Sequence, residues 1–265
     1  MRQKLVQKNT VITAVSWFIL LGILAGGVYW LSTVKQSVIK QYDAIILRSA
    51  QAATSEVSRY KFIRLPGTNA SFLVEPRYKY TNQADVWALV NKTHSIELAY
   101  MPKMLEPVPI PTYNNEQLLV RPELIEPLRQ LYAAAESEGV YLMVRSAYRS
   151  SQDQAAVTKE VDQGLAALPG QSEHQTGLAV DFNNQPVACS NYCYLSDVNA
   201  TWLANNAYKY GFVLRYTPGK ESITGYPAEA WHYRYVGERL AKALHDTGLS
   251  YEELYDLFAQ ARPRL

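Results

Sequence analysis

The chain has 265 residues, of which 48% are hydrophobic and 19% charged, an ordinary balance for one substantial domain with a smaller appendage. The formal net charge is +2, and it falls to −1 when the three N-terminal cations Arg2, Lys4 and Lys8 are set aside. A nearly neutral domain offers no basic surface for phosphates, which argues against nucleic acid as a partner.

Residues 11–34, VITAVSWFILLGILAGGVYWLSTV, contain no charge over 24 positions, and about 20 apolar residues suffice to cross a bilayer as a helix. A cleaved signal peptide is the alternative, but its apolar stretch usually has about 7 to 15 residues and ends at a small-x-small site. Cations without acids before the run favour a cytoplasmic N-terminus. We therefore expect a cytoplasmic segment 1–10, a single-pass anchor 11–34 in contact with lipid of the inner cell membrane, and an extracytoplasmic remainder.

The residues after the anchor change character twice. Residues 35–58 mix charged and apolar residues at helical spacing without Gly or Pro, which predicts a helical stalk. From Arg59 the sequence becomes rich in Tyr, Phe, Pro and Gly, and short strand-like runs flank a predicted turn. We interpret 35–83 as a stalk and juxtamembrane segment with no assigned role, and 84–265 as the main domain.

Helix and strand signals alternate irregularly through the main domain. Residues 123–139 have helical periodicity that stops at Gly139, and residues 140–146 alternate as a strand. A capping box of Ser151 and Gln154 predicts a helix that runs to about Ala167, and Asn199 is expected to cap another. Strands are expected at 212–216 and 231–236. Two helices should follow, one from Glu238 to Gly248 and a last one opened by Ser250 with Glu253. This order predicts an α+β fold with a helix-flanked, largely antiparallel sheet.

Cys189 and Cys193 are the two cysteines of the chain and lie four positions apart. An oxidising compartment would favour a small disulfide loop between them, which requires a tight turn. A metal role is less favoured, because two thiolates without nearby His or Cys do not complete a tetrahedral site.

The stretch SEHQTGLAVDF, residues 172–182, joins a polar cluster to a short strand. In a strand, Leu178, Val180 and Phe182 share the buried face, so Asp181 points to the other side. Gly177 can adopt a positive φ and fold the preceding loop back, which would bring His174 near Asp181. An extended backbone would point the neighbouring Glu173 away from both.

A second cluster, PAEAWHYRYVG, occupies residues 227–237. A catalytic zinc takes three His or carboxylate ligands and keeps one position open, and His174, Asp181 and His232 would form such a set. Glu229, three residues before His232, is the candidate general base for the attacking water and the leaving amine.

These motifs resemble the zinc D-alanyl-D-alanine carboxypeptidases of the VanY type. That family carries S-x-H-x-x-G-x-A-x-D, E-x-W-H and an upstream S-G-Y-R-S segment, and RSAYRSSQDQ at 145–154 resembles the last with Ala147 in place of glycine. The resemblance covers about residues 84–265 and implies a compact fold of the D,D-peptidase and hedgehog type. It implies that His174, Asp181 and His232 bind Zn2+, that Glu229 is the base and that Arg149 contacts the substrate.

The function implied is removal of the terminal D-alanine from peptidoglycan stem peptides, outside the cytoplasm. Gln154 and Ser172 are further substrate-contact candidates, and Trp231 is a candidate for orienting His232. Three alternatives stay open: a peptidoglycan endopeptidase, a D,D-dipeptidase, and a non-catalytic wall-binding module. A serine peptidase is disfavoured, because SVIK at 37–40 fits S-x-x-K but neither partner motif of that class occurs. D,D- versus L,D-specificity, chain-length preference and oligomeric state are not determined by the sequence.

Overall fold

The computed structural model describes residues 61–261 apart from 69–70, 75–81, 161–165 and 185–194. The expected cytoplasmic segment, the anchor at 11–34, the helical stalk at 35–58 and both cysteines lie outside the described residues. Within the described part of the chain, no helix is long and apolar enough to cross a membrane.

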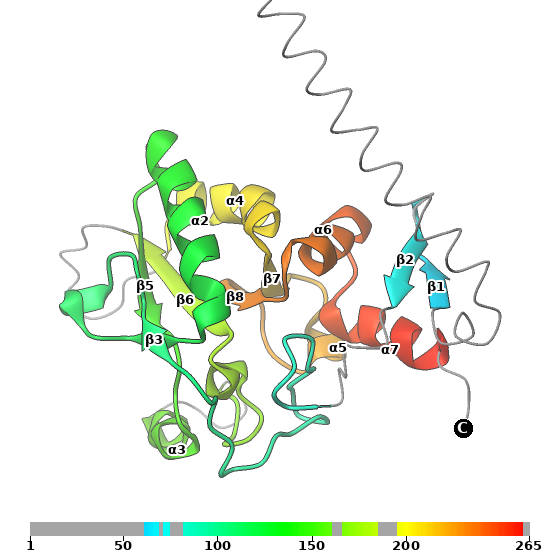
Figure 1. The fold of residues 1–265 in the computed structure, drawn as a ribbon, viewed down its shortest axis with the longest axis horizontal. Coiled ribbons are helices and arrows are strands. Elements are labelled where there is room, and N and C mark those ends of the chain that lie inside the picture. Colours follow the sequence, from blue (N-terminus) through cyan, green and yellow to red (C-terminus); the bar gives the residue numbers. More distant parts are fainter. Residues whose placement is uncertain (1–60, 69–70, 75–81, 161–165, 185–194, 262–265) are drawn as a thin grey trace, which may run out of the picture. The chain divides into compact units, whose positions relative to one another are not determined.

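The centre of the fold is a four-stranded sheet (Figure 1). Its strands, in spatial order, are β5 (Leu142–Ser146), β6 (Ala179–Asn184), β8 (Glu229–Tyr235) and β7 (Phe212–Tyr216). Every neighbouring pair is antiparallel, and helices flank the sheet, which confirms the α+β expectation. Chain order and spatial order differ, because β8 inserts between β6 and β7.

One face of this sheet is covered by α2 (Ile125–Ser137), α4 (Asp197–Asn206) and the short helix η5 (Ala207–Tyr210). The side chains packed between them are apolar and include Leu128, Leu131, Val144, Val180, Phe182, Leu203, Phe212 and Tyr233. Leu178, Val180 and Phe182 are all buried there, so the alternation predicted for this strand is confirmed. Burial of this apolar area is the main stabilising term for the sheet.

A second apolar cluster joins α6 (Glu238–Thr247) and α7 (Tyr251–Ala261) to the hairpin of β1 (Lys61–Arg64) and β2 (Ser71–Val74). The rings of Phe72, Trp87 and Phe258 pack together with centroids 5.6–5.9 Å apart. The compact unit runs from Tyr60 to Leu265. The hairpin therefore packs against the helices α6 and α7 of this unit.

The remaining elements are short strands and helices outside the four-stranded sheet. They are β3 (Glu106–Pro107) paired with β4 (Leu119–Val120), the short helices η2 (Tyr113–Asn115), η3 (Pro122–Leu124) and η4 (Glu173–Thr176), and the helices α3 (Ser151–Glu160) and α5 (Glu221–Thr224).

The residues expected to cap two of the helices were wrong. Ser150 and Asp153 cap α3 reciprocally, and Ser196 accepts from the backbone N–H of Asn199 at the start of α4.

Candidate active site

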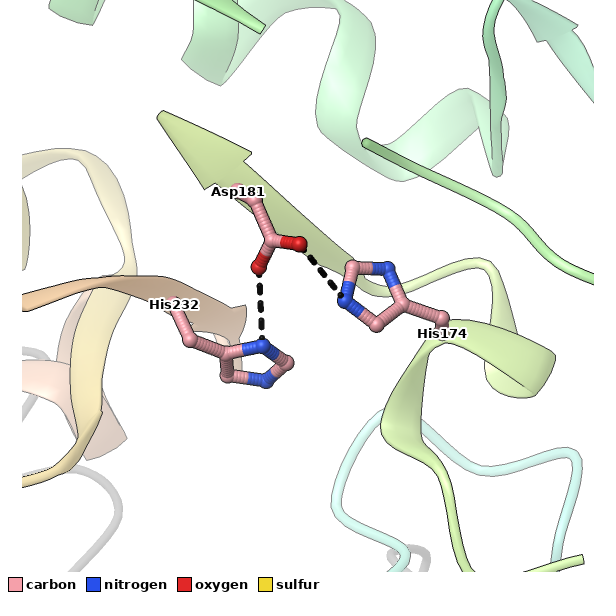
Figure 2. A group of neighbouring side chains, drawn as sticks. All are labelled: His174, Asp181 and His232. Carbon is pink, nitrogen blue, oxygen red and sulfur yellow. Dashed lines mark hydrogen bonds and ion pairs between the residues drawn. The ribbon is translucent and has the colours of Figure 1, made fainter. Parts of the chain in front are cut away.

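Three side chains from two strands and one helical turn converge on the polar face of the sheet (Figure 2). Asp181 of β6 and His232 of β8 are direct cross-strand partners, so their side chains stand next to each other. His174 reaches them from η4, and the two imidazole rings lie 4.9 Å apart at 80°. Sequence reasoning predicted this group of three, and the structure brings it together.

Gly177 ends η4 and reverses the chain into β6. Its φ is +71°, and its N–H donates to the carbonyl of His174 at 3.1 Å. A Cβ here would lie 3.1 Å from side-chain atoms of both Leu105 and Arg121. Glycine is required both for the left-handed turn and for this close approach, which confirms its expected role as the pivot of the hairpin-like element.

Each imidazole turns one ring nitrogen toward Asp181. Nε2 of His174 lies 3.3 Å from Oδ2 of Asp181, and Nδ1 of His232 lies 3.0 Å from Oδ1 (Figure 2). The opposite nitrogens have other partners: Nδ1 of His174 lies 2.6 Å from the carbonyl of Ala147, and Nε2 of His232 lies 3.3 Å from Oε2 of Glu173. A carbonyl only accepts, so Nδ1 of His174 carries the proton and Nε2 presents a lone pair.

This arrangement fits a divalent cation. One ligand atom from each of the three residues can be chosen so that all lie within 4.8 Å of one another. The nitrogens that face Asp181 are the ones free to coordinate, and the outward nitrogens are tied to acceptors, which is how metal-binding histidines are oriented in proteins. Two imidazoles and one carboxylate form a donor set used by catalytic zinc.

The protonation tendencies of the three residues also suit a cation. Burial, followed by the charge of Arg149, lowers the pKa of His174 to about 4, so this imidazole is neutral at neutral pH. Burial alone would lower the pKa of His232, but hydrogen bonds to Asp181 and Glu173 outweigh it and raise that pKa to about 9. Burial would raise the pKa of Asp181, and the charges and hydrogen bonds of the two histidines hold it well below its ordinary value. The cluster therefore favours one positive charge at its centre, which a metal supplies when it displaces the proton.

Glu229 stands at the edge of this group. The pairing of β7 with β8 shifts register between Leu214 and Tyr216, so that Tyr216 faces Glu229. Without the shift, strand alternation would put Glu229 and His232 on opposite faces, yet Oε2 of Glu229 lies 3.9 Å from Nδ1 of His232. Burial raises the pKa of Glu229 to about 7, with the positive charge of His232 lowering it and the carboxylate of Asp181 raising it. A carboxyl group with this pKa can both accept and return a proton near neutral pH.

Arg149 lies in the loop between β5 and α3. Its backbone N–H donates to the carbonyl of His174 at 3.3 Å, which ties the loop to the site. Burial lowers the pKa of Arg149, and the charges of Asp181 and Glu229 act in the opposite direction. Its Nε is buried and has no hydrogen-bond partner among the described residues. A buried donor of this kind is suited to a substrate oxygen.

The weaker sequence candidates take different places. Gln154 is buried in α3, where its amide donates to the carbonyl of Ala167 at 2.7 Å and its Oε1 finds no partner among the described residues. Ser172 is buried directly before η4. Trp231 precedes His232 on β8 and is partly exposed. Their expected roles stay predictions.

Several residues of the site were missed by the sequence analysis. Glu173 was expected to point away, but η4 is helical, so consecutive side chains are not opposed and Glu173 faces His232. Arg215 and Arg234 pair with Glu173, and the ring of Tyr216 packs 4.9 Å from that of His232. Arg234 could have been found, because it lies two positions after His232 on the same strand face.

Comparison with known proteins identifies relatives of this chain. Residues 117–238 match the family model VanY, described as D-alanyl-D-alanine carboxypeptidase. A putative carboxypeptidase, YodJ, of Bacillus subtilis (strain 168) is 36% identical over 188 residues, which are 66% of this chain and 68% of the relative.

Two solved structures are similar in fold and sequence. The LdcB LD-carboxypeptidase superposes with a TM-score of 0.60 and 31% identity, covering 74% of this chain and 94% of that one. A mutant of the vancomycin resistance D,D-pentapeptidase VanY from the VanB-type cassette, in complex with Zn(II), has a TM-score of 0.56 and 31% identity, covering 66% and 99%. The chain belongs to the VanY family of D-alanyl-D-alanine carboxypeptidases.

Proposed function

We propose that this protein is a membrane-anchored zinc carboxypeptidase that removes the terminal D-alanine from peptidoglycan stem peptides. The observation that carries the proposal is the convergence of His174, Asp181 and His232 within cation-binding distance, with Glu229 and Arg149 beside them. A wall-binding module without activity would have no use for a carboxylate with a pKa near 7 next to a metal site.

Zinc suits the donor set of two imidazoles and one carboxylate, and a VanY relative in complex with Zn(II) supports this metal. When bound, zinc polarises a carbonyl and lowers the pKa of a coordinated water to about 7. The protein's own contribution is to hold the ligands: His174 through the Ala147 carbonyl, and Asp181 through its pairing with His232 across the sheet.

Glu229 is the group that moves protons. Its carboxylate accepts a proton from the attacking water and returns it to the amine of the departing D-alanine. Both steps need a pKa close to the working pH. In the metal-free site burial raises the pKa of Glu229 to about 7, against the lowering by His232 and with a further rise from Asp181. The lateral position of Glu229, 3.9 Å from the nearest imidazole nitrogen, leaves it free for this role.

Arg149 binds an oxygen of the substrate. Its buried Nε and rigid guanidinium fork match either the terminal carboxylate of the peptide or the developing oxyanion at the scissile carbonyl. Of these two oxygens, only the terminal carboxylate is specific to substrates with a free C-terminus, so binding of that group separates a carboxypeptidase from an endopeptidase.

The location of the enzyme follows from the sequence. The uncharged run 11–34 after three cations supports an anchor in the inner cell membrane with the N-terminus in the cytoplasm. The domain would then lie on the side of the membrane where the peptidoglycan is.

The test is incubation of the full chain with a muropeptide pentapeptide and tetrapeptide, with and without a chelator, and identification of the released products. Free D-alanine from at least one substrate, lost with chelator and restored by zinc, is the expected result. Release of a dipeptide, or cleavage within the stem without free D-alanine, would contradict the proposal. The substrate that is trimmed also separates D,D- from L,D-specificity.

A further inference from the structure

Glu173 contacts one of the three candidate ligands, His232, and is almost completely buried, at 1% exposure. Its two oxygens have separate tasks. Oε2 lies 3.3 Å from Nε2 of His232, the nitrogen that faces away from Asp181. Oε1 accepts from Nε of Arg215 at 2.8 Å and from Nη1 of Arg234 at 3.0 Å.

The two arginines are themselves held in place. Arg215 makes a two-pronged pair with Glu252 of α7, at 2.9 and 2.6 Å, and Arg234 donates through Nη2 to the carbonyls of Val86 and Ala88. Two buried glutamates thus balance two buried arginines.

We propose that Glu173 is a positioning residue that keeps the proton of His232 on Nε2 and so presents Nδ1 to the metal. The inference rests on the metal site proposed above. An imidazole has one lone pair in its neutral form, so coordination through Nδ1 requires the proton on Nε2. A carboxylate that takes two guanidinium donors on one oxygen offers the other as an acceptor, and this fixes the tautomer.

The two oxygens of Glu173 have different partners, and this distinguishes a role in orienting His232 from simple ion pairing with the arginines. Buried ion pairs are weak contributors to stability, because the cost of desolvation offsets the attraction. Both arginines share Oε1, which leaves Oε2 directed at His232. The arginines therefore hold the carboxylate in this orientation, and its second oxygen faces the imidazole of His232.

The substitution Glu173→Gln tests this arrangement. The two guanidinium groups only donate, so the amide oxygen turns toward them and the NH2 group turns toward His232. Nε2 of His232 must then accept, and the proton moves to Nδ1, where a metal has to displace it. We expect zinc dissociation constants of the full chain, measured by competition with a chelating indicator, to weaken about 10- to 100-fold.

Glu252→Gln is the matched control. It also removes a buried negative charge that pairs with Arg215, but the side-chain partners of Glu252 are Arg215 and Asn91, and His232 is not among them. We expect both variants to lower the melting temperature of the metal-free protein, while zinc affinity stays within about threefold of wild type for Glu252→Gln alone. Equal loss of zinc affinity in both variants, or none in Glu173→Gln, would overturn the proposal.

A measurement on the wild-type protein tests the role of Glu173 even if the variants do not fold. Long-range proton–nitrogen correlation of the histidine rings in the zinc-loaded full chain should show His232 protonated on Nε2. A ring protonated on Nδ1 and coordinated through Nε2 would refute the role of Glu173. Absence of any zinc binding by the wild-type protein would instead refute the proposed metal site.

Discussion

The two faces of the four-stranded sheet are built from the same strands but differ in role: one forms the apolar core and the other carries the candidate metal site. Val180, Phe182 and Tyr233 are buried in the apolar core that also contains side chains of α2 and α4. Their immediate neighbours Asp181 and His232 point to the other face and form the candidate metal site. Because alternate side chains of a strand face opposite ways, one face can be filled for stability while the other holds charges for chemistry.

Loss of the proton carrier on the polar face should have the largest effect on activity. We expect Glu229→Gln to lower kcat by about 10²- to 10⁴-fold, because an amide cannot transfer the proton. Zinc affinity should stay near that of the wild type, because Glu229 is not one of the three ligands. Steady-state kinetics with zinc analysis measures both, and activity close to wild type would remove Glu229 from the mechanism.

Arg149→Ala should come next, with a decrease of about 10²- to 10³-fold in kcat/KM, the effect of losing one oxyanion-type donor. Arg149→Lys should recover only part of the loss, since an ammonium lacks the guanidinium fork. The split between kcat and KM shows which oxygen Arg149 binds. A change confined to KM indicates the terminal carboxylate, and a change confined to kcat indicates the oxyanion.

A substitution on the apolar face should change stability and leave chemistry intact. Leu131 of α2 is fully buried, and Leu131→Ala is expected to lower the free energy of unfolding by about 2–5 kcal/mol. Denaturant unfolding measures this loss, and kcat per folded molecule should remain that of the wild type. A large change in kcat without loss of stability would show that the two faces are not separable.

The smallest effect is expected at the N-terminal cap of α7. Ser250 Oγ accepts from the backbone N–H of Glu253, and the Glu253 carboxylate accepts from the N–H of Ser250 and from Lys220. Ser250→Ala should lower the free energy of unfolding by about 0.5–2 kcal/mol without affecting zinc binding. Unfolding curves of the metal-free protein check this value.

The same cap gives a pH dependence of defined sign. Burial would raise the pKa of Glu253, but hydrogen bonds from Lys220 and Ser250 lower it below its ordinary value. The folded state therefore binds this proton less readily than the unfolded state, and the contribution to stability is present above the ordinary glutamate pKa and is lost as pH falls through the lowered one. The stability difference between wild type and Glu253→Gln should shrink on acidification through that range. A difference that grew instead would contradict the assigned pairing.

The sequence predicted the local parts of the site well. Strand alternation placed Asp181 opposite the core, Gly177 was identified as the turn, and the spacing of Glu229 and His232 indicated a shared site. These features depend on residues a few positions apart, whose geometry is set by backbone periodicity. The cap by Ser250 and Glu253 was predicted for the same reason.

The long-range parts could not be predicted. Arg215 and Glu252 are 37 positions apart, and no local pattern pairs them. Glu173 depends on whether residues 173–176 coil or extend, which four polar residues do not decide. Helix starts were displaced because Ser, Asp and Asn all serve as caps, so Ser150 and Ser196 were passed over for neighbours. The hairpin at 61–74 owes its place to aromatic packing against α7, not to its own sequence pattern.

Zinc titration of the metal-free full chain tests the central claim most directly. Calorimetry should give one zinc per wild-type chain, and His174→Ala, Asp181→Ala and His232→Ala should each abolish tight binding while the folded content by circular dichroism is retained. Tight binding that survives the loss of any one of these three side chains, or a wild-type chain that binds no zinc, would contradict the account.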